Sequence, residues 1–281
     1  MKVKKVLIVQ AISLIGIRAL MGATVMETKI HSPSMDKDIP LSVIVPDDYS
    51  KKPTCRWPSV YVLHGAFGNH SNHRDVDVKQ AVDKYGFIAV CPDGGVTGWW
   101  IDSPVNPKMK YESHVVKEVL PYVDANFRTF ADRKKRAIVG WSMGGHGACY
   151  IGFRAKEYFG AVGNIFGGVD LRPFSGKWGL DAVLGDKGKN PENWEKFSVI
   201  GQLDRIRNGD VSLISVIGTS DFFLTVNRDL HERLIKMGVE HDYVEVRAEN
   251  SDKSSHGPFG PRGMRIVARF LDNFFKTGKG S

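Results

Sequence analysis

A serine flanked by glycines stands where a nucleophile could be held. Residues 140–144 read GWSMG and match the pattern G-x-S-x-G, between an apolar run at 137–139 and a helical run that begins with the second glycine. A strand that turns abruptly into a helix forces unusual backbone angles on the central residue, and glycine on either side avoids a collision with the crossing backbone. The pattern predicts that the Ser142 hydroxyl projects from a tight turn. A glycine-rich turn whose serine only caps a helix is the alternative.

A serine hydroxyl is a weak nucleophile until a base removes its proton, and where a serine is held at such a turn the acid and the base follow it in the chain. Four of the nine histidines follow Ser142. Three lie inside predicted elements or next to them: His146, which is expected to make structural hydrogen bonds in its helix, His231 and His241. His256 lies in a loop before the last predicted helix, so we predict it as the base.

An aspartate that follows a buried strand could orient this base. Asp221 comes after the apolar run 213–217 through the turn-forming Gly218-Thr219-Ser220. A carboxylate there would hold the His256 ring and stabilise its charged form. Capping the next helix is a common task for an aspartate at such a turn, and Asp221 could do both. Asp252 is the reserve candidate.

Backbone N–H groups near the serine could stabilise negative charge on a substrate carbonyl oxygen. The loop HGAFG at 64–68 directly follows the apolar run 60–63, which is the place for such a donor. We assign the N–H groups of Ala66 and of Met143, the residue after the serine, to this oxyanion hole. Three aromatic residues could line an acyl pocket or belong to the core, and the sequence leaves both open: Phe67, Trp99 and Trp100.

The elements that must position these residues alternate between strand-like and helix-like runs. An opening hairpin is predicted from 24–30 and 41–45. Short apolar runs predict strands at 60–63, 87–90, 137–139, 213–217 and 243–246. Helical spacing occurs at 75–85, 114–127, 144–154, 224–237 and 262–275. The alternation predicts an α/β fold with a mostly parallel sheet covered on both faces, and 170–210 reads as an insertion.

Length and composition fit one soluble catalytic domain at 24–281. The chain has 281 residues, 42% of them hydrophobic and 25% charged, which is enough to bury a core. The net charge of +8 is scattered, and its one compact run, 133–136, is expected to be a solvated turn, so no nucleic-acid partner is predicted. Three cysteines are too few for a disulfide framework.

The first 23 residues resemble a signal peptide. A basic stub precedes an apolar run that Arg18 ends before it could span a bilayer, so no stable membrane anchor is predicted. The expected location is periplasmic or extracellular. The alternative is a cytoplasmic protein with an uncleaved N-terminal segment.

Taken together, these residues resemble the esterase family of α/β hydrolases, which includes feruloyl and acetyl xylan esterases, S-formylglutathione hydrolases and mycolyl transferases. The similarity covers nearly all of the chain after the leader, and its carriers are 63–68, 100–104, 116–124, 140–148, 167–173 and 218–221. It implies an α/β-hydrolase fold and a triad of Ser142, Asp221 and His256. The chain departs from the family at 255–258, SHGP, where many relatives have Gly-His-Asp-Trp.

The resemblance implies a serine carboxylic-ester hydrolase that needs no cofactor or metal. Its substrate would be a small-molecule or carbohydrate ester, with short-chain, acetyl or hydroxycinnamoyl acyl groups. Glutathione thioesters rank low, because the thioesterase branch carries a cysteine-containing loop where this chain has Ala66-Phe67-Gly68. Two alternatives remain: acyl transfer to an alcohol by the same triad, and a non-catalytic relative that binds sugar or lipid.

Overall fold

A mixed eight-stranded sheet forms the centre of the protein. The computed structural model describes residues 22–247 and 255–280, so most of the predicted signal peptide and the reserve acid Asp252 lie outside the described residues. The strand order is β1-β2-β4-β3-β5-β6-β7-β8, with antiparallel pairing at β1-β2 and β2-β4 and parallel pairing elsewhere. The strands are β1 Thr24–Ser32, β2 Lys37–Val45, β3 Ser59–Leu63, β4 Ile88–Pro92, β5 Arg136–Trp141, β6 Ala161–Ile165, β7 Ser212–Gly218 and β8 Asp242–Val246. The predicted α/β class is confirmed.

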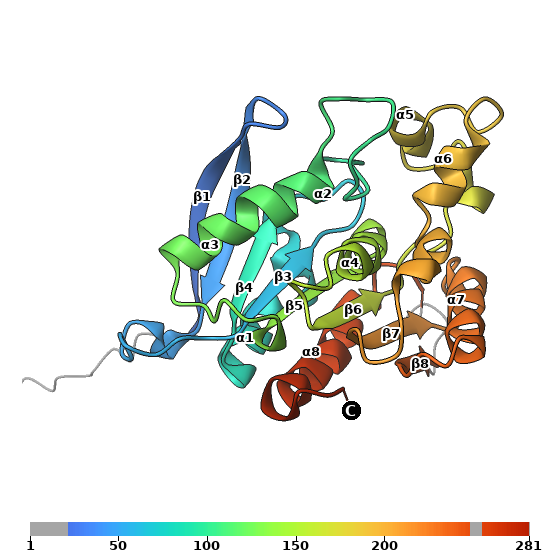
Figure 1. Cartoon of the computed structure of the whole chain (residues 1–281). Helices are drawn as coiled ribbons and strands as arrows, with labels where there is room; N and C mark the ends of the chain where they lie inside the picture. The colour runs from blue at the N-terminus through green and yellow to red at the C-terminus, as the bar shows by residue number, and fades with distance from the viewer. Residues whose placement is uncertain (1–21, 248–254, 281) are drawn as a thin grey trace, which may run out of the picture.

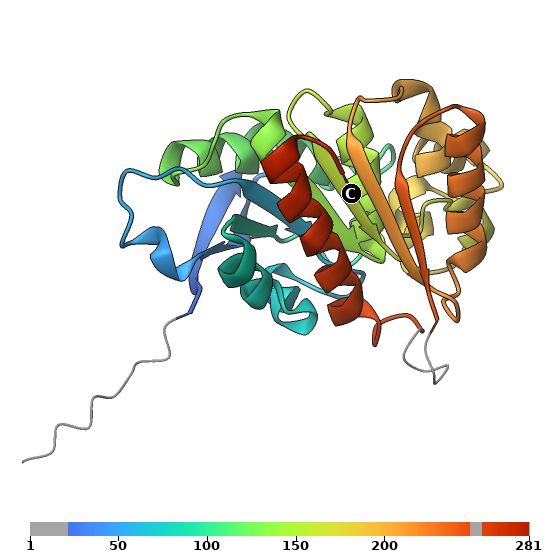
Figure 2. The ribbon, with the colours of Figure 1, turned by 90° about the horizontal axis from the view of Figure 1, so that it is seen from below.

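Helices cover both faces of this sheet. The longer helices are α1 Val78–Tyr85, α3 Leu120–Asn126, α4 Met143–Arg154, α7 Leu224–Lys236 and α8 Gly260–Thr277. Figure 1 shows α3 and α4 on one face, and Figure 2 shows α1 and α8 side by side on the other. The predicted helix 114–127 is part of a longer run, in which α2 Tyr111–Ser113 and a π-helical segment, His114–Val119, precede α3.

Strand β6 was missed from the sequence because two residues interrupt its apolar run. Gly163 is required there, since a Cβ would lie 2.7 Å from side-chain carbons of Val139 and Val267. The amide of Asn164 is fully buried, but it donates to Ser215 Oγ and Asn227 Oδ1 and accepts from Gly167 N–H. A buried polar side chain costs little when its hydrogen bonds are made.

The segment 170–210 is more ordered than its composition indicates. It contains α5 Leu180–Leu184, α6 Pro191–Lys196 and two 3₁₀ turns, Arg172–Phe174 and Val199–Arg205, and its last turn packs on α4 (Figure 1). The basic run at 133–136 is only partly the predicted solvated turn. Arg136 begins β5 and is buried, where it pairs with Asp124 at 2.6 Å.

Candidate active site

The serine turn has the backbone geometry that its glycines predict. Ser142 connects β5 to α4 with φ 58° and ψ −121°, angles that residues other than glycine rarely adopt. A Cβ on Gly140 would lie 2.3 Å from the Gly144 carbonyl oxygen, and one on Gly144 would lie 2.0 Å from the Leu63 carbonyl oxygen. Only glycine therefore allows the strand, the turn and the helix to approach this closely.

Three predicted residues from distant parts of the chain meet at this turn. The Ser142 hydroxyl lies 2.8 Å from His256 Nε2, and His256 Nδ1 lies 2.9 Å from Asp221 Oδ2. The Asp221 side chain is fully buried, whereas the imidazole is 21% exposed. In the neutral ring, Nδ1–H donates to the carboxylate, so Nε2 is free to accept the serine proton.

The Asp221 carboxylate makes two hydrogen bonds, one to His256 and one to the backbone next to α7, although Phe223 and not Asp221 is the N-cap of that helix. While Oδ2 faces His256, Oδ1 accepts a hydrogen bond of 2.8 Å from the Phe223 N–H at the start of α7. The second bond ties the carboxylate to a rigid helix terminus. The plane of the carboxylate, and with it the direction from which the imidazole is held, is therefore fixed from two sides.

Phenylalanine rings enclose the His256 imidazole, a feature that the sequence did not predict. The Phe222 ring lies 4.2 Å away at 31°, Phe166 lies 4.6 Å away edge-on, and Phe223 lies 5.5 Å away edge-on. Phe166 and Phe223 are buried, but Phe222 is 51% exposed and stacks on Trp178 from the segment 170–210. The signal available in the sequence is the pair of phenylalanines directly after Asp221.

Replacing Phe222 with alanine is expected to lower kcat/KM on an ester by about fivefold. The aromatic face covers one side of the imidazole and stabilises its charged form, an effect of about 1 kcal/mol at a partly exposed position. Steady-state kinetics of Phe222→Ala and Phe222→Tyr measure it, and the tyrosine variant should retain most of the activity. Ile235→Ala, which shortens an exposed apolar side chain on α7, is the control. Equal rates for wild type and Phe222→Ala would contradict this expectation.

The loop at 64–68 lies directly beside the serine. A Cβ on Gly65 would be 3.2 Å from the Ser142 Cβ, and Phe67 has φ 63° while its N–H donates to the Val96 carbonyl at 2.7 Å. Met143 is the first residue of α4, so its N–H has no acceptor within the helix. In the described part of the chain, the Ala66 N–H likewise has no acceptor. Both N–H groups remain available to a bound oxyanion.

The aromatic residues predicted to line either an acyl pocket or the core have different environments. Trp99 and Trp100 are buried in the core, and their indole N–H groups donate to the carbonyls of Trp178 and His64. Of the two alternatives, the structure therefore supports the core for both tryptophans, and no substrate contact is assigned to them. Phe67 is 69% exposed at the loop that flanks Ser142.

His146 has the structural role expected for it. Its ring is fully buried in α4 between the carbonyls of Trp99, 3.1 Å from Nδ1, and Phe197, 2.8 Å from Nε2. Burial lowers its pKa to about 4, although both carbonyls act in the opposite direction. Burial also lowers the pKa values of His64 and His114.

Stability should therefore fall when the pH drops below about 6.5, the pKa of an unfolded histidine. Between this pH and about 4, the unfolded chain binds a proton that buried His146 does not, so protonation favours unfolding. For His146 alone we expect a loss of about 2 kcal/mol between pH 7 and pH 5. Denaturant unfolding at both values measures it. The loss should shrink by this amount in His146→Gln, and equal losses in both proteins would refute the assignment.

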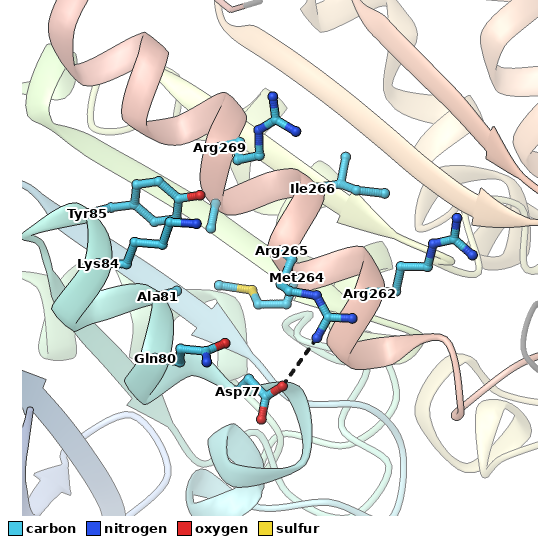
Figure 3. Close-up of a pocket in the computed structure, with 11 residues that line it drawn as sticks. Asp77, Gln80, Ala81, Lys84, Tyr85, Arg262, Met264, Arg265, Ile266 and Arg269 are labelled. Carbon is cyan, nitrogen blue, oxygen red and sulfur yellow. Dashed lines mark hydrogen bonds and ion pairs between the residues drawn. The ribbon is translucent and has the colours of Figure 1, made fainter. Parts of the chain in front are cut away.

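A groove between α1 and α8 lies apart from these residues. It has a volume of about 410 Å³ and basic walls, which include Lys84, Arg269 and Arg265, the last paired with Asp77 at 3.4 Å (Figure 3). None of the predicted site residues lines it. The groove lies on the face of the sheet that α1 and α8 cover and is separate from Ser142, Asp221 and His256.

The described residues hold no metal-binding cluster and no membrane-spanning helix. Residues 22–247 and 255–280 contain no group of three or more His, Cys, Asp or Glu side chains that could hold a metal ion. Across the same ranges, no helix is both long and apolar enough to cross a membrane. Cys91 and Cys149 are buried free thiols, and burial raises the pKa of each.

A mostly parallel sheet with helices on both faces, and a serine at the turn from β5 into α4, define an α/β hydrolase. Comparison with family models agrees with this class. The Esterase family model, described as putative esterase, matches residues 32–257, and the chain belongs to this family.

A relative in sequence and two solved structures illustrate the similarity of this chain to known proteins. Esterase Rv1288 of Mycobacterium tuberculosis is 30% identical over 237 residues, which are 73% of this chain and 51% of that protein, so the chain spans about half the length of this relative. A solved ferulic acid esterase has a TM-score of 0.76 at 22% identity, covering 91% of this chain and 99% of that chain. An S-formylglutathione hydrolase from Agrobacterium tumefaciens has a TM-score of 0.73 at 21% identity, covering 91% and 96%.

Proposed function

We propose that this protein is a serine carboxylic-ester hydrolase in which Ser142, His256 and Asp221 form the catalytic triad. The single observation that carries the proposal is the continuous pair of hydrogen bonds, 2.8 Å and 2.9 Å, that joins the hydroxyl, the imidazole and the carboxylate. Membership of the Esterase family supports ester hydrolysis as the reaction. The same bonds argue against a relative that only binds sugar or lipid.

In the acylation half-reaction, Ser142 Oγ attacks the carbonyl carbon of the ester while its proton passes to His256 Nε2. The negative charge that develops on the carbonyl oxygen is stabilised by the N–H groups of Ala66 and Met143. When the tetrahedral intermediate collapses, the bond to the leaving oxygen breaks and His256 returns the proton to that oxygen. An alcohol departs, and the acyl group remains on the serine.

In the deacylation half-reaction, water takes the place of the alcohol. His256 Nε2 removes a proton from the water, whose oxygen attacks the acyl carbon, and the same proton then returns to Ser142 Oγ as the acid leaves. Asp221 keeps Nδ1 protonated throughout, so Nε2 is the nitrogen that exchanges protons. No redox change occurs, and the residues named supply every proton transfer.

For the substrate, we propose short-chain, acetyl or hydroxycinnamoyl esters of carbohydrates. A similar solved structure is named as a ferulic acid esterase. The exposed aromatic side chains beside the triad, Phe67 and Phe222, offer apolar surface for an acyl group.

The test combines a covalent probe with a substrate panel. A fluorophosphonate, which reacts with activated serines, should label the wild-type protein and fail to label Ser142→Ala. The rates of hydrolysis of feruloyl, acetyl and butyryl esters then rank the acyl groups. Product analysis with added glycerol distinguishes hydrolysis from acyl transfer. No labelling of the wild type would overturn the proposed triad, and inactivity on all three esters would overturn the proposed substrates.

A further inference from the structure

His64 begins the loop beside the nucleophile, and both of its ring nitrogens are engaged by backbone groups. Nε2 accepts a hydrogen bond of 2.9 Å from the Gly94 N–H. A nitrogen that accepts in this way carries no proton, so in the neutral ring the proton is on Nδ1. Nδ1 lies 2.8 Å from the Gly65 carbonyl oxygen and therefore donates to it. The side chain is buried, and burial lowers its pKa, which favours this neutral form.

The Gly65 carbonyl is thus held from two directions. It accepts from His64 Nδ1–H and also from the Gly68 N–H at 3.1 Å. The Gly65 carbonyl and the Ala66 N–H belong to one planar peptide unit, which is trans like every described peptide bond, so they point in opposite directions. Whatever fixes the carbonyl therefore also fixes the direction of the Ala66 N–H.

We propose that His64 is a positioning residue of the oxyanion hole: its Nδ1–H holds the Gly65–Ala66 peptide plane so that the Ala66 N–H faces the developing negative charge. This inference rests on the proposed function, because it assigns a task within the same reaction. His64 touches neither the substrate nor Ser142 in this role. It acts only through the peptide whose donor it orients, and a donor that is already oriented needs no reorganisation when the charge develops.

The surrounding contacts make this arrangement rigid. The His64 carbonyl accepts from the indole N–H of Trp100 at 3.1 Å, and the two rings meet edge-on at 5.0 Å. The next peptide is held as well, since Phe67 N–H donates to the Val96 carbonyl. The buried Trp100 therefore has a structural role, because it holds the loop through the His64 carbonyl and does not contact a substrate.

Two substitutions of similar size separate the proposed role from a purely structural one. In His64→Asn the side-chain N–H₂ occupies the place of Nδ1 and can still donate to the Gly65 carbonyl. In His64→Gln the amide reaches the place of Nε2, where it can accept from the Gly94 N–H but no longer donates to Gly65. Both disturb the same buried site, yet only the glutamine variant releases the peptide plane.

We expect His64→Asn to keep kcat within about threefold of the wild type and His64→Gln to lose about 30-fold, with KM nearly unchanged in both. Complete removal of one oxyanion donor costs roughly 10²–10³-fold in kcat, so a misdirected donor should cost less. The preference for an oxoester over the matching thionoester should also fall in His64→Gln alone, because sulfur accepts hydrogen bonds weakly and gains little from the Ala66 N–H. A defect of packing would not change that preference.

Equal kcat values and equal oxoester preferences for the two variants would overturn the proposal. A second measurement needs no variant and uses a crystal structure of the fluorophosphonate adduct of the wild type. In this adduct the phosphonyl oxygen should accept a hydrogen bond from the Ala66 N–H, while the Gly65 carbonyl still accepts one from His64 Nδ1–H. A Gly65 carbonyl turned away from His64 in this adduct would also overturn it. Failure of the proposed function is distinguishable, because the wild-type protein itself would then show neither labelling nor hydrolysis.

Discussion

Ser142→Ala is expected to lower kcat on a responsive ester by roughly 10⁶-fold, to the limit of detection, while the fold is retained. The Ser142 hydroxyl is the only atom group that the proposed reaction joins covalently to the substrate. Removing it also removes the proton donor that lies 2.8 Å from His256 Nε2. The activity that remains would come from the oxyanion donors and from binding alone.

The substitution is suited to a clean comparison because it is small. Ser142 keeps its positive φ in the folded chain, and alanine tolerates that backbone about as well as serine does, so the melting temperature should shift by only a few degrees. Ser175→Ala, which removes an exposed hydroxyl bonded to Asp181, is the matched control and should keep full activity. Ester hydrolysis by Ser142→Ala at a rate close to that of the wild type would place the nucleophile elsewhere.

The sequence predicted the central features of this site because their signals are local. The positive φ of Ser142 and the close approach of Gly140 to Gly144 belong to five consecutive residues, so the motif already contains them, whereas the close approach of Gly144 to Leu63 comes from the neighbouring strand β3. His256 was reached by elimination, since every other histidine after the serine stands in or next to an element. Both inferences needed only the order of strands and helices along the chain.

The features that were missed depend on contacts between distant segments. Phe166 directly follows β6 and contacts His256. This strand was not predicted, because Gly163 and Asn164 interrupt its apolar run. Trp178 stacks on Phe222 and belongs to the segment 170–210, whose sequence shows no helical or strand periodicity. No periodicity in a sequence reports which ring will lie against which, because that is decided by tertiary packing.

Trp99 and Trp100 also show that a sequence pattern alone does not reveal tertiary contacts. The sequence left two alternatives open for Trp99 and Trp100, an acyl pocket near Ser142 or the core, and the structure buries both indoles, with the Trp100 N–H bonded to the His64 carbonyl. A Cβ on Gly147 of α4 would collide with Trp100 at 2.4 Å, which shows how tightly the indole fills the space beside the helix. Residue type alone could not decide between a pocket and the core, because large aromatic side chains are common in both.

Asp221→Asn is expected to lower kcat by about 10⁴-fold, although the two side chains have almost the same shape. The reason is the second hydrogen bond of the carboxylate. The Phe223 N–H, 2.8 Å from Oδ1, requires an acceptor, so the oxygen of an asparagine would take that position. Its N–H₂ group would then face His256 Nδ1 and donate to it. The ring proton would move to Nε2, which could no longer accept the proton of Ser142.

The orientation imposed by the Phe223 N–H can be separated from the effect of charge. In Asp221→Ala the carboxylate is lost, but nothing donates to Nδ1, so part of the population can keep the productive tautomer. The alanine variant should therefore be at least as active as the asparagine variant, despite its larger change in shape. The pH dependence of kcat/KM for both variants, with melting curves as the folding control, measures the difference. A clearly more active asparagine variant would show that the Phe223 N–H does not fix the orientation of residue 221.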